Sequence, residues 1–156
     1  MNSTHIANLI INPKDGLIAG LDKKTSTMKE NFKISILWVS IIAGMSAHSL
    51  MDMIPLFWNA NIAISNDGVA PMSMLVLMAV VSVTLPMTGL LLSLYACKSR
   101  YKLVHFCLAA LIALFCTAHC TELIFTFEFP QLFIHPMLVV LSITLAYESW
   151  KWYKEA

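Results

Sequence analysis

The sequence predicts an all-α protein, a polytopic integral membrane four-helix bundle whose N-terminus and C-terminus both lie on the cytoplasmic side. Hydrophobic residues make up 58% of the 156 residues and charged residues only 12%, and the mean hydropathy is +0.74. This composition lies well outside the range of soluble globular domains. Two further observations support the prediction: the apolar residues fall in four long runs, and the basic residues all fall on one side of the resulting threading.

The four apolar runs cover approximately residues 34–58, 71–97, 103–127 and 132–150. Each is near or above the ~20 residues that a helix needs to cross ~30 Å of hydrocarbon. Because the runs are apolar on consecutive residues rather than on alternate ones, they predict helices and not membrane strands. We therefore divide the chain into a polar cytoplasmic segment, residues 1–32, and a four-helix domain, residues 33–156. The polar segment is expected to form either a short interfacial helix or a flexible tail.

The basic residues predict the orientation of the chain. If the four helices cross the membrane in turn, all ten lysines and arginines fall before the first span, between the second and third, or after the fourth. The positive-inside rule assigns that side to the cytoplasm. In a chain without a recognisable cleavable signal, this pattern favours a bacterial or archaeal cytoplasmic (inner) membrane. Membrane lipid and other membrane subunits are the expected partners, and no basic patch indicates nucleic-acid binding.

Ionisable residues inside the spans are expected to converge near the external end. Because the direction of the helices alternates, residues late in the first and third spans lie at the depth of residues early in the fourth. Spacings of three and four residues place two histidine–carboxylate pairs each on one helix face. His105, early in the third span, falls at the cytoplasmic end and is excluded. The resulting candidate site comprises His48, Asp52, His119, Glu122 and His135.

A bound transition metal would explain why these groups are tolerated in the membrane. An ionisable side chain near the centre of a spanning helix costs roughly 2.5–3.5 kcal/mol on insertion scales, and such residues usually face the interior. Imidazole ligands suit copper, zinc and iron, and thioether sulfur selects Cu(I). Cys116 shares a helix face with His119 but is expected to be a packing residue. Copper is favoured, with zinc or iron as alternatives, because six methionines are expected in the external half: Met45, Met51, Met53, Met72, Met74 and Met137.

Several other interpretations remain open at this point. The histidine–carboxylate pairs could satisfy each other as polar contacts between helices. His48 with His119 or His135 could ligate haem b in an anchor subunit that passes electrons to or from quinone, although the external half has no lysine or arginine for the propionates. The chain could also be a non-catalytic accessory subunit of a larger membrane complex. A catalytic metal would use Glu122 or Asp52 as general base in hydrolysis or oxygen chemistry, so the sequence does not decide whether the protein is an enzyme.

Pro86 stands inside the second predicted span. Proline has no N–H to donate and its ring clashes with the preceding turn, so it kinks or interrupts a helix. We expect a kink in the helix over residues 71–97, with Ser82 able to relieve the carbonyl that loses its partner.

Overall fold

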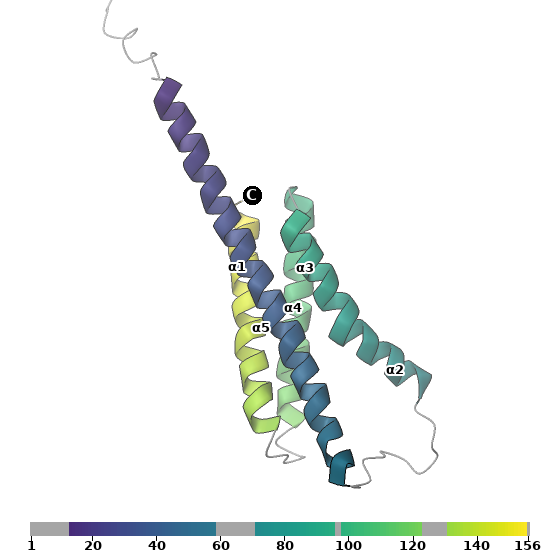
Figure 1. Ribbon diagram of the computed structural model, residues 1–156. Coiled ribbons are helices and arrows are strands. Elements are labelled where there is room, and N and C mark those ends of the chain that lie inside the picture. The colour runs from purple at the N-terminus through teal and green to yellow at the C-terminus, as the bar shows by residue number, and fades with distance from the viewer. Residues whose placement is uncertain (1–12, 59–70, 96–97, 123–130, 156) are drawn as a thin grey trace, which may run out of the picture.

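The computed structural model of the protein describes residues 13–58, 71–95, 98–122 and 131–155, with all their side chains except those of residues 13–17, 19, 23–24, 26–27 and 122. These described residues are almost all helical and include no strand. In chain order the elements are α1 (Pro13–Met53), η3 (Ile54–Trp58), α2 (Met72–Ala79), η4 (Val80–Thr84), α3 (Leu85–Tyr95), α4 (Ser99–Glu122) and α5 (Gln131–Lys154), as Figure 1 shows.

Four helical stretches are long and apolar enough to cross a membrane. They cover Met28–Trp58, Met72–Tyr95, Ser99–Thr121 and Gln131–Lys154, with hydropathies between 1.5 and 2.3. The prediction of four membrane-length helices is therefore confirmed. Two predicted spans extend further, into residues 96–97 and 123–127, which lie outside the described residues.

The helix α1 is longer than the predicted first span. It begins at Pro13 and runs for 41 residues, so residues 13–32 continue the first membrane helix rather than forming a separate interfacial helix or a flexible tail. The stretch contains four lysines and two leucines, which favour helices, and its single proline stands at the first position of the helix, where proline is tolerated. Figure 1 shows the N-terminal part of α1 projecting beyond the other helices.

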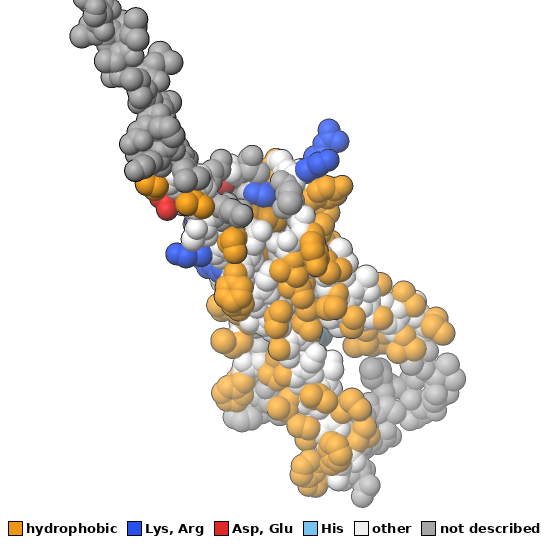
Figure 2. Space-filling view, turned by 45° about the horizontal axis from the view of Figure 1, so that its top comes forward, with side chains coloured by type: hydrophobic (Ala, Val, Ile, Leu, Met, Phe, Trp, Pro, Cys, Tyr) orange, Lys and Arg blue, Asp and Glu red, His pale blue; other side chains and the backbone are white. Residues whose placement is uncertain are grey.

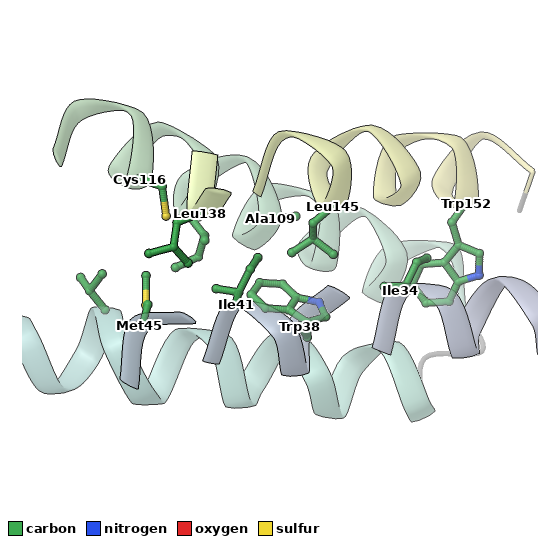
Figure 3. Packing of buried hydrophobic residues seen from close by; sticks show 11 residues of the cluster. Ile34, Trp38, Ile41, Met45, Ala109, Cys116, Leu138, Leu145 and Trp152 are labelled. Atoms are coloured by element: carbon green, nitrogen blue, oxygen red, sulfur yellow. The ribbon is translucent and has the colours of Figure 1, made fainter. Parts of the chain in front are cut away.

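A row of buried side chains runs between the helices, and Figure 3 shows most of it. Its centre is Trp38, which is 0% exposed and donates a hydrogen bond from Nε1 to Nε2 of His105 at 2.7 Å. Because lipid is as apolar as this core, association of the helices depends on close packing and on polar contacts more than on apolar burial. The row consists of Ile34, Trp38, Ile41, Met45, Val81, Ala109, Ile112, Cys116, Leu138, Leu145 and Trp152.

Small residues allow the helices to approach closely. A Cβ atom added to Gly89 would overlap the indole ring of Trp38, and one added to Gly44 would lie 2.7 Å from Cδ2 of Leu138. The hydroxyl oxygens of Ser35 in α1 and Ser93 in α3 are 2.8 Å apart and share a hydrogen bond. Glycine and serine at such contacts are typical of membrane helices.

The second span is interrupted in its middle, as Pro86 predicts. Residues Val80–Thr84 form a π turn, and the Thr84 hydroxyl, rather than that of Ser82, donates to a backbone carbonyl, at Ala79, over 3.4 Å. α2 has no buried residue before this turn, whereas α3 after it packs against α1 and α4. Figure 1 shows α2 slanting away from the other helices. The break thus separates a packed half from a splayed half of the same span.

The described basic side chains gather at one end of the helices, which Figure 2 shows at the top of the packed region. There, Nζ of Lys33 pairs with Oε1 of Glu148 at 2.5 Å, and Nζ of Lys151 lies 3.8 Å from Oε1 of Glu30. His48 follows Lys33 along the same continuous helix, about 22 Å further on at ~1.5 Å per residue. The charged end and the candidate site therefore lie at different depths.

Candidate metal centre

Three histidines from three helices meet at the end away from the basic residues. His48 belongs to α1, His119 to the last turn of α4 and His135 to the second turn of α5. One ring nitrogen of each lies within 4.8 Å of the other two, and the ring centroids are 4.6–5.3 Å apart. The structure thus brings together three of the five residues that the sequence predicts as ligands.

Gln131 determines where the proton of His48 sits. An ionised carboxylate can only accept hydrogen bonds, so the amide Nε2 of Gln131 faces Asp52 and donates to its Oδ1. The amide oxygen of Gln131 then faces His48 and accepts from its Nδ1 at 2.7 Å. With the proton on Nδ1, His48 presents the lone pair of Nε2. A chain of carboxylate, amide and imidazole such as this one orients and tunes a metal-ligating histidine.

His135 is held in the same way by the backbone. Its Nδ1 donates to the carbonyl oxygen of Gln131 at 3.1 Å, which leaves Nε2 as the nitrogen with a lone pair. The residue is 4% exposed. Gln131 therefore orients two of the three imidazoles, one through its side chain and one through its carbonyl.

The separation of the nitrogens suits a small ion. Two imidazole ligands of a tetrahedral ion, with bonds of about 2.05 Å, stand about 3.3 Å apart, and Nε2 of His48 and Nε2 of His119 are 3.4 Å apart. The third imidazole, that of His119, is positioned by stacking on Phe115, with the ring centroids 5.8 Å apart. All the nitrogen pairs lie within 4.8 Å, so closing them on one ion requires movements of up to about 1.5 Å.

A cavity of about 340 Å³ lies against the three rings. Pockets of roughly 300–1,000 Å³ with apolar walls and a few convergent polar groups are typical of small-molecule sites. This site therefore has room for a small molecule beside an ion. The cavity is lined by Met45, His48, Ser49, Asp52, Met53, Leu77, Met78, Val81, Ser82, Phe115, Cys116, His119, His135 and Leu138.

Of the two carboxylates that the sequence predicts as ligands, the structure describes the side chain of Asp52 but not that of Glu122. Asp52 lies beside the histidines rather than within the three-nitrogen group: its Oδ2 is 3.5 Å from Nε2 of His48, and it lines the cavity. Its position suits a group that accepts a proton from a ligand of the ion. Glu122 is the last residue of α4, and its side chain lies outside the described residues.

Sequence reasoning missed Gln131. This residue is 3% exposed and stands four positions before His135, so both face the same side of α5. The i,i+4 spacing that singled out His48 and Asp52 would have found it as well. The cavity itself had no sequence signal, because it depends on how far α2 diverges from the other helices.

The exclusion of His105 from the site agrees with its position. It is 0% exposed, accepts from Trp38 and packs edge-on against Trp152 with a ring-centroid separation of 5.3 Å. His105 is therefore a core residue near the basic end.

Comparisons with protein-family models, with curated proteins and with solved structures find no match for this chain.

Proposed function

We propose that the protein is an integral membrane metal-binding protein that holds one transition-metal ion on His48, His119 and His135. The single observation that carries the proposal is the convergence of three imidazole nitrogens from three separate helices within 4.8 Å of one another. Two of the three imidazoles are held with Nδ1 as the hydrogen-bond donor, which directs their Nε2 lone pairs to a ligand. Neutral histidines in this state are the form that binds metal ions.

The hydrogen bonds favour an ion over self-satisfied polar contacts. The polar groups do contact one another, with Oδ2 of Asp52 at 3.5 Å and Nε2 of His119 at 3.4 Å from Nε2 of His48, but contacts that only join helices do not require three imidazoles at one point. Here Asp52 and His48 are both engaged by Gln131, and this arrangement is the one found around metal-ligating histidines. An ion also supplies the positive charge that offsets a carboxylate placed in an apolar span.

The same geometry favours an ion over haem b. Two axial imidazoles on opposite sides of a porphyrin place their nitrogens about 4 Å apart, twice a bond of ~2.0 Å. A porphyrin plane between any two of these imidazoles would leave no place for the third, whose ring nitrogen lies within 4.8 Å of theirs. An absorption spectrum without a Soret band is therefore expected for the purified protein, and a Soret band would contradict the proposal.

Copper is the ion that we favour, with zinc and iron as alternatives. Thioether and thiol sulfur select Cu(I), whereas imidazole alone suits copper, zinc and iron alike. The wall of the cavity adds three methionines and one cysteine to the three imidazoles: Met45, Met53, Met78 and Cys116. Competition between Cu(I) and Zn(II) for the purified protein is expected to leave copper bound, and retention of zinc in the presence of equal Cu(I) would contradict this preference.

Catalysis is the second candidate function, and the cavity favours it. Three protein ligands leave a coordination position for water or substrate, as in catalytic zinc sites. The cavity of about 340 Å³ provides space at that position. Asp52, which lines the same cavity, would accept the proton of a metal-bound water. Loading the site with paramagnetic Cu(II) and measuring water exchange at the ion by proton relaxation tests for the open position.

For the orientation in the membrane we propose cytoplasmic termini and a metal site near the external face of a bacterial or archaeal cytoplasmic membrane. The gathering of the described lysines and arginines at the end opposite His48 supports this under the positive-inside rule. In a variant whose four native cysteines are replaced by serine, a cysteine introduced at Lys154 is expected to react with a membrane-impermeant maleimide only in inverted vesicles. Labelling of intact cells would contradict the orientation.

Removing the Gln131 side chain is expected to weaken metal binding without removing a ligand. Gln131→Ala leaves Nδ1 of His48 without its acceptor, so the imidazole can rotate and change tautomer. Loss of such an outer-shell partner typically lowers metal affinity by about 10–100-fold. Thr117→Ala is the matched control, since the Thr117 hydroxyl donates to the carbonyl of Ala113 in its own helix and does not line the cavity. Metal titrations of both variants give the comparison, and equal affinity of Gln131→Ala and the unmodified protein would contradict the orienting role.

A further inference from the structure

The cavity beside the histidines adjoins a second hollow on the lipid-facing side of the helices. This outer hollow is more open, has a volume of about 370 Å³ and lies between α1 and the π turn η4. Its outer wall includes Leu50 and Val83, which are 65% and 59% exposed. The two hollows share part of their lining, namely Met45, Ser49, Met53 and Ser82.

The two exposed residues of the outer wall lie inside membrane-length helices. Val83 is near the middle of the candidate span Met72–Tyr95, and Leu50 lies inside the candidate span Met28–Trp58. Side chains exposed at that depth face lipid. The outer hollow therefore faces the hydrocarbon of the bilayer, and it adjoins the inner cavity at Ser49 and Ser82, a junction that we call the passage.

The break in the second span produces this passage. A π turn widens a helix locally, and such turns are frequent at functional sites. Here it spans Val80–Thr84 and contains both Ser82 and Val83. Before it, α2 leaves the packed region and buries no residue, while Leu77 and Met78 of α2 still line the inner cavity. Figure 2 shows hydrophobic side chains covering this face of the molecule.

We propose that the site takes an amphipathic molecule dissolved in the bilayer, which reaches the ion sideways between α1 and η4. This inference depends on the proposed metal site. The molecule has an oxygen-donor head that binds the open coordination position and an unbranched apolar tail that lies along Leu77, Met78 and Val81. The inner cavity, at about 340 Å³, is roughly twice the 150 Å³ of an apolar cavity that takes up benzene, so it holds the head and the first part of a tail.

Alkyl hydroxamates test this inference because their heads bind metal ions through oxygen and their tails can be varied. The probes are octanohydroxamate and acetohydroxamate, added in lipid nanodiscs to protein loaded with Cu(II), whose d–d absorption changes when an oxygen donor binds. The copper absorption spectrum reports binding of the probe, and elemental analysis reports whether the metal stays bound. We expect octanohydroxamate to bind at least tenfold more tightly than acetohydroxamate.

Variants separate use of the passage from simple partition of the longer probe into lipid. Val83→Phe fills the outer hollow from η4, and Ser46→Phe fills it from α1; both positions line the outer hollow and not the inner cavity. Both are expected to keep their copper, to bind octanohydroxamate at least tenfold more weakly, and to bind acetohydroxamate as before. Thr88→Phe is the matched control, because Thr88 is exposed in the same span and lines neither hollow. It should behave like the unmodified protein.

The outcomes distinguish the two proposals. If copper is retained but both variants of the outer hollow bind octanohydroxamate as tightly as Thr88→Phe does, the lateral route is wrong and the metal site stands. If the unmodified protein retains no metal, the proposed function is wrong and the lateral inference is wrong with it.

Discussion

His119→Gln is expected to abolish stoichiometric metal binding. The substitution removes one of three imidazoles whose nitrogens lie within 4.8 Å of one another. Loss of an outer-shell partner already costs about 10–100-fold in affinity, so loss of a ligand should cost more than ~100-fold. Elemental analysis after purification in mild detergent without added chelator measures the effect. His48→Gln and His135→Gln should behave alike, because the three rings act on one ion.

His105→Gln is the matched control for these variants. It removes a histidine of the same chain, but one that is buried near the basic end and accepts from Nε1 of Trp38. Glutamine keeps an oxygen that can accept this hydrogen bond. The variant is expected to bind metal as the unmodified protein does. If His105→Gln is folded by circular dichroism and still loses as much metal as His119→Gln, a specific three-histidine site is contradicted.

Gly89→Ala is expected to destabilise the protein more than any other glycine substitution among the described residues. The added Cβ would overlap the indole ring of Trp38. That ring is 0% exposed and hydrogen-bonded to His105, so it has no space to move into. Overpacking of this kind costs about 1–3 kcal/mol and occasionally more. Thermal unfolding in detergent, followed by circular dichroism, should show a clearly lowered midpoint.

Two other glycines calibrate this result. Gly44→Ala would bring a Cβ to 2.7 Å from Cδ2 of Leu138, the end of a flexible side chain, so its effect should be smaller. Gly20→Ala meets no atom within 4 Å, and alanine favours a helix over glycine by about 1 kcal/mol. It should leave stability unchanged or raise it slightly. If Gly89→Ala were as stable as Gly20→Ala, the contact between α1 and α3 around Trp38 would be wrong.

The membrane-length helices were predictable from composition because nearly every residue that crosses the hydrocarbon has to be apolar. A run such as residues 103–127 has to be apolar over its whole length, and this signal needs no knowledge of neighbouring helices. The extension of α1 back to Pro13 was not predictable in the same way. Residues 13–32 are polar, and hydropathy cannot distinguish a polar helix from a polar tail.

The candidate site was only partly accessible to sequence reasoning. The depth rule for antiparallel helices selects His48, His119 and His135, which the structure brings within reach of one ion. The rule gives the depth of a residue but not its rotation about the helix axis. It therefore selected Asp52 together with the histidines, although Asp52 lies beside the three-nitrogen group and not within it. Gln131 was missed because glutamine carries no charge, so the high cost of an ionisable group in the membrane does not mark it. The lateral passage depends on the π turn at Val80–Thr84, whose geometry the presence of Pro86 suggests but does not specify.

X-ray absorption spectroscopy at the metal edge of the copper-loaded protein tests the central claim most directly. We expect an outer-shell pattern of three imidazoles, with nitrogen ligands at about 2.0 Å from the ion. The same measurement on His119→Gln should show that pattern lost. A first shell made only of water oxygens or of sulfur, or a protein that takes up no ion at all, would contradict a metal centre formed by the three histidines.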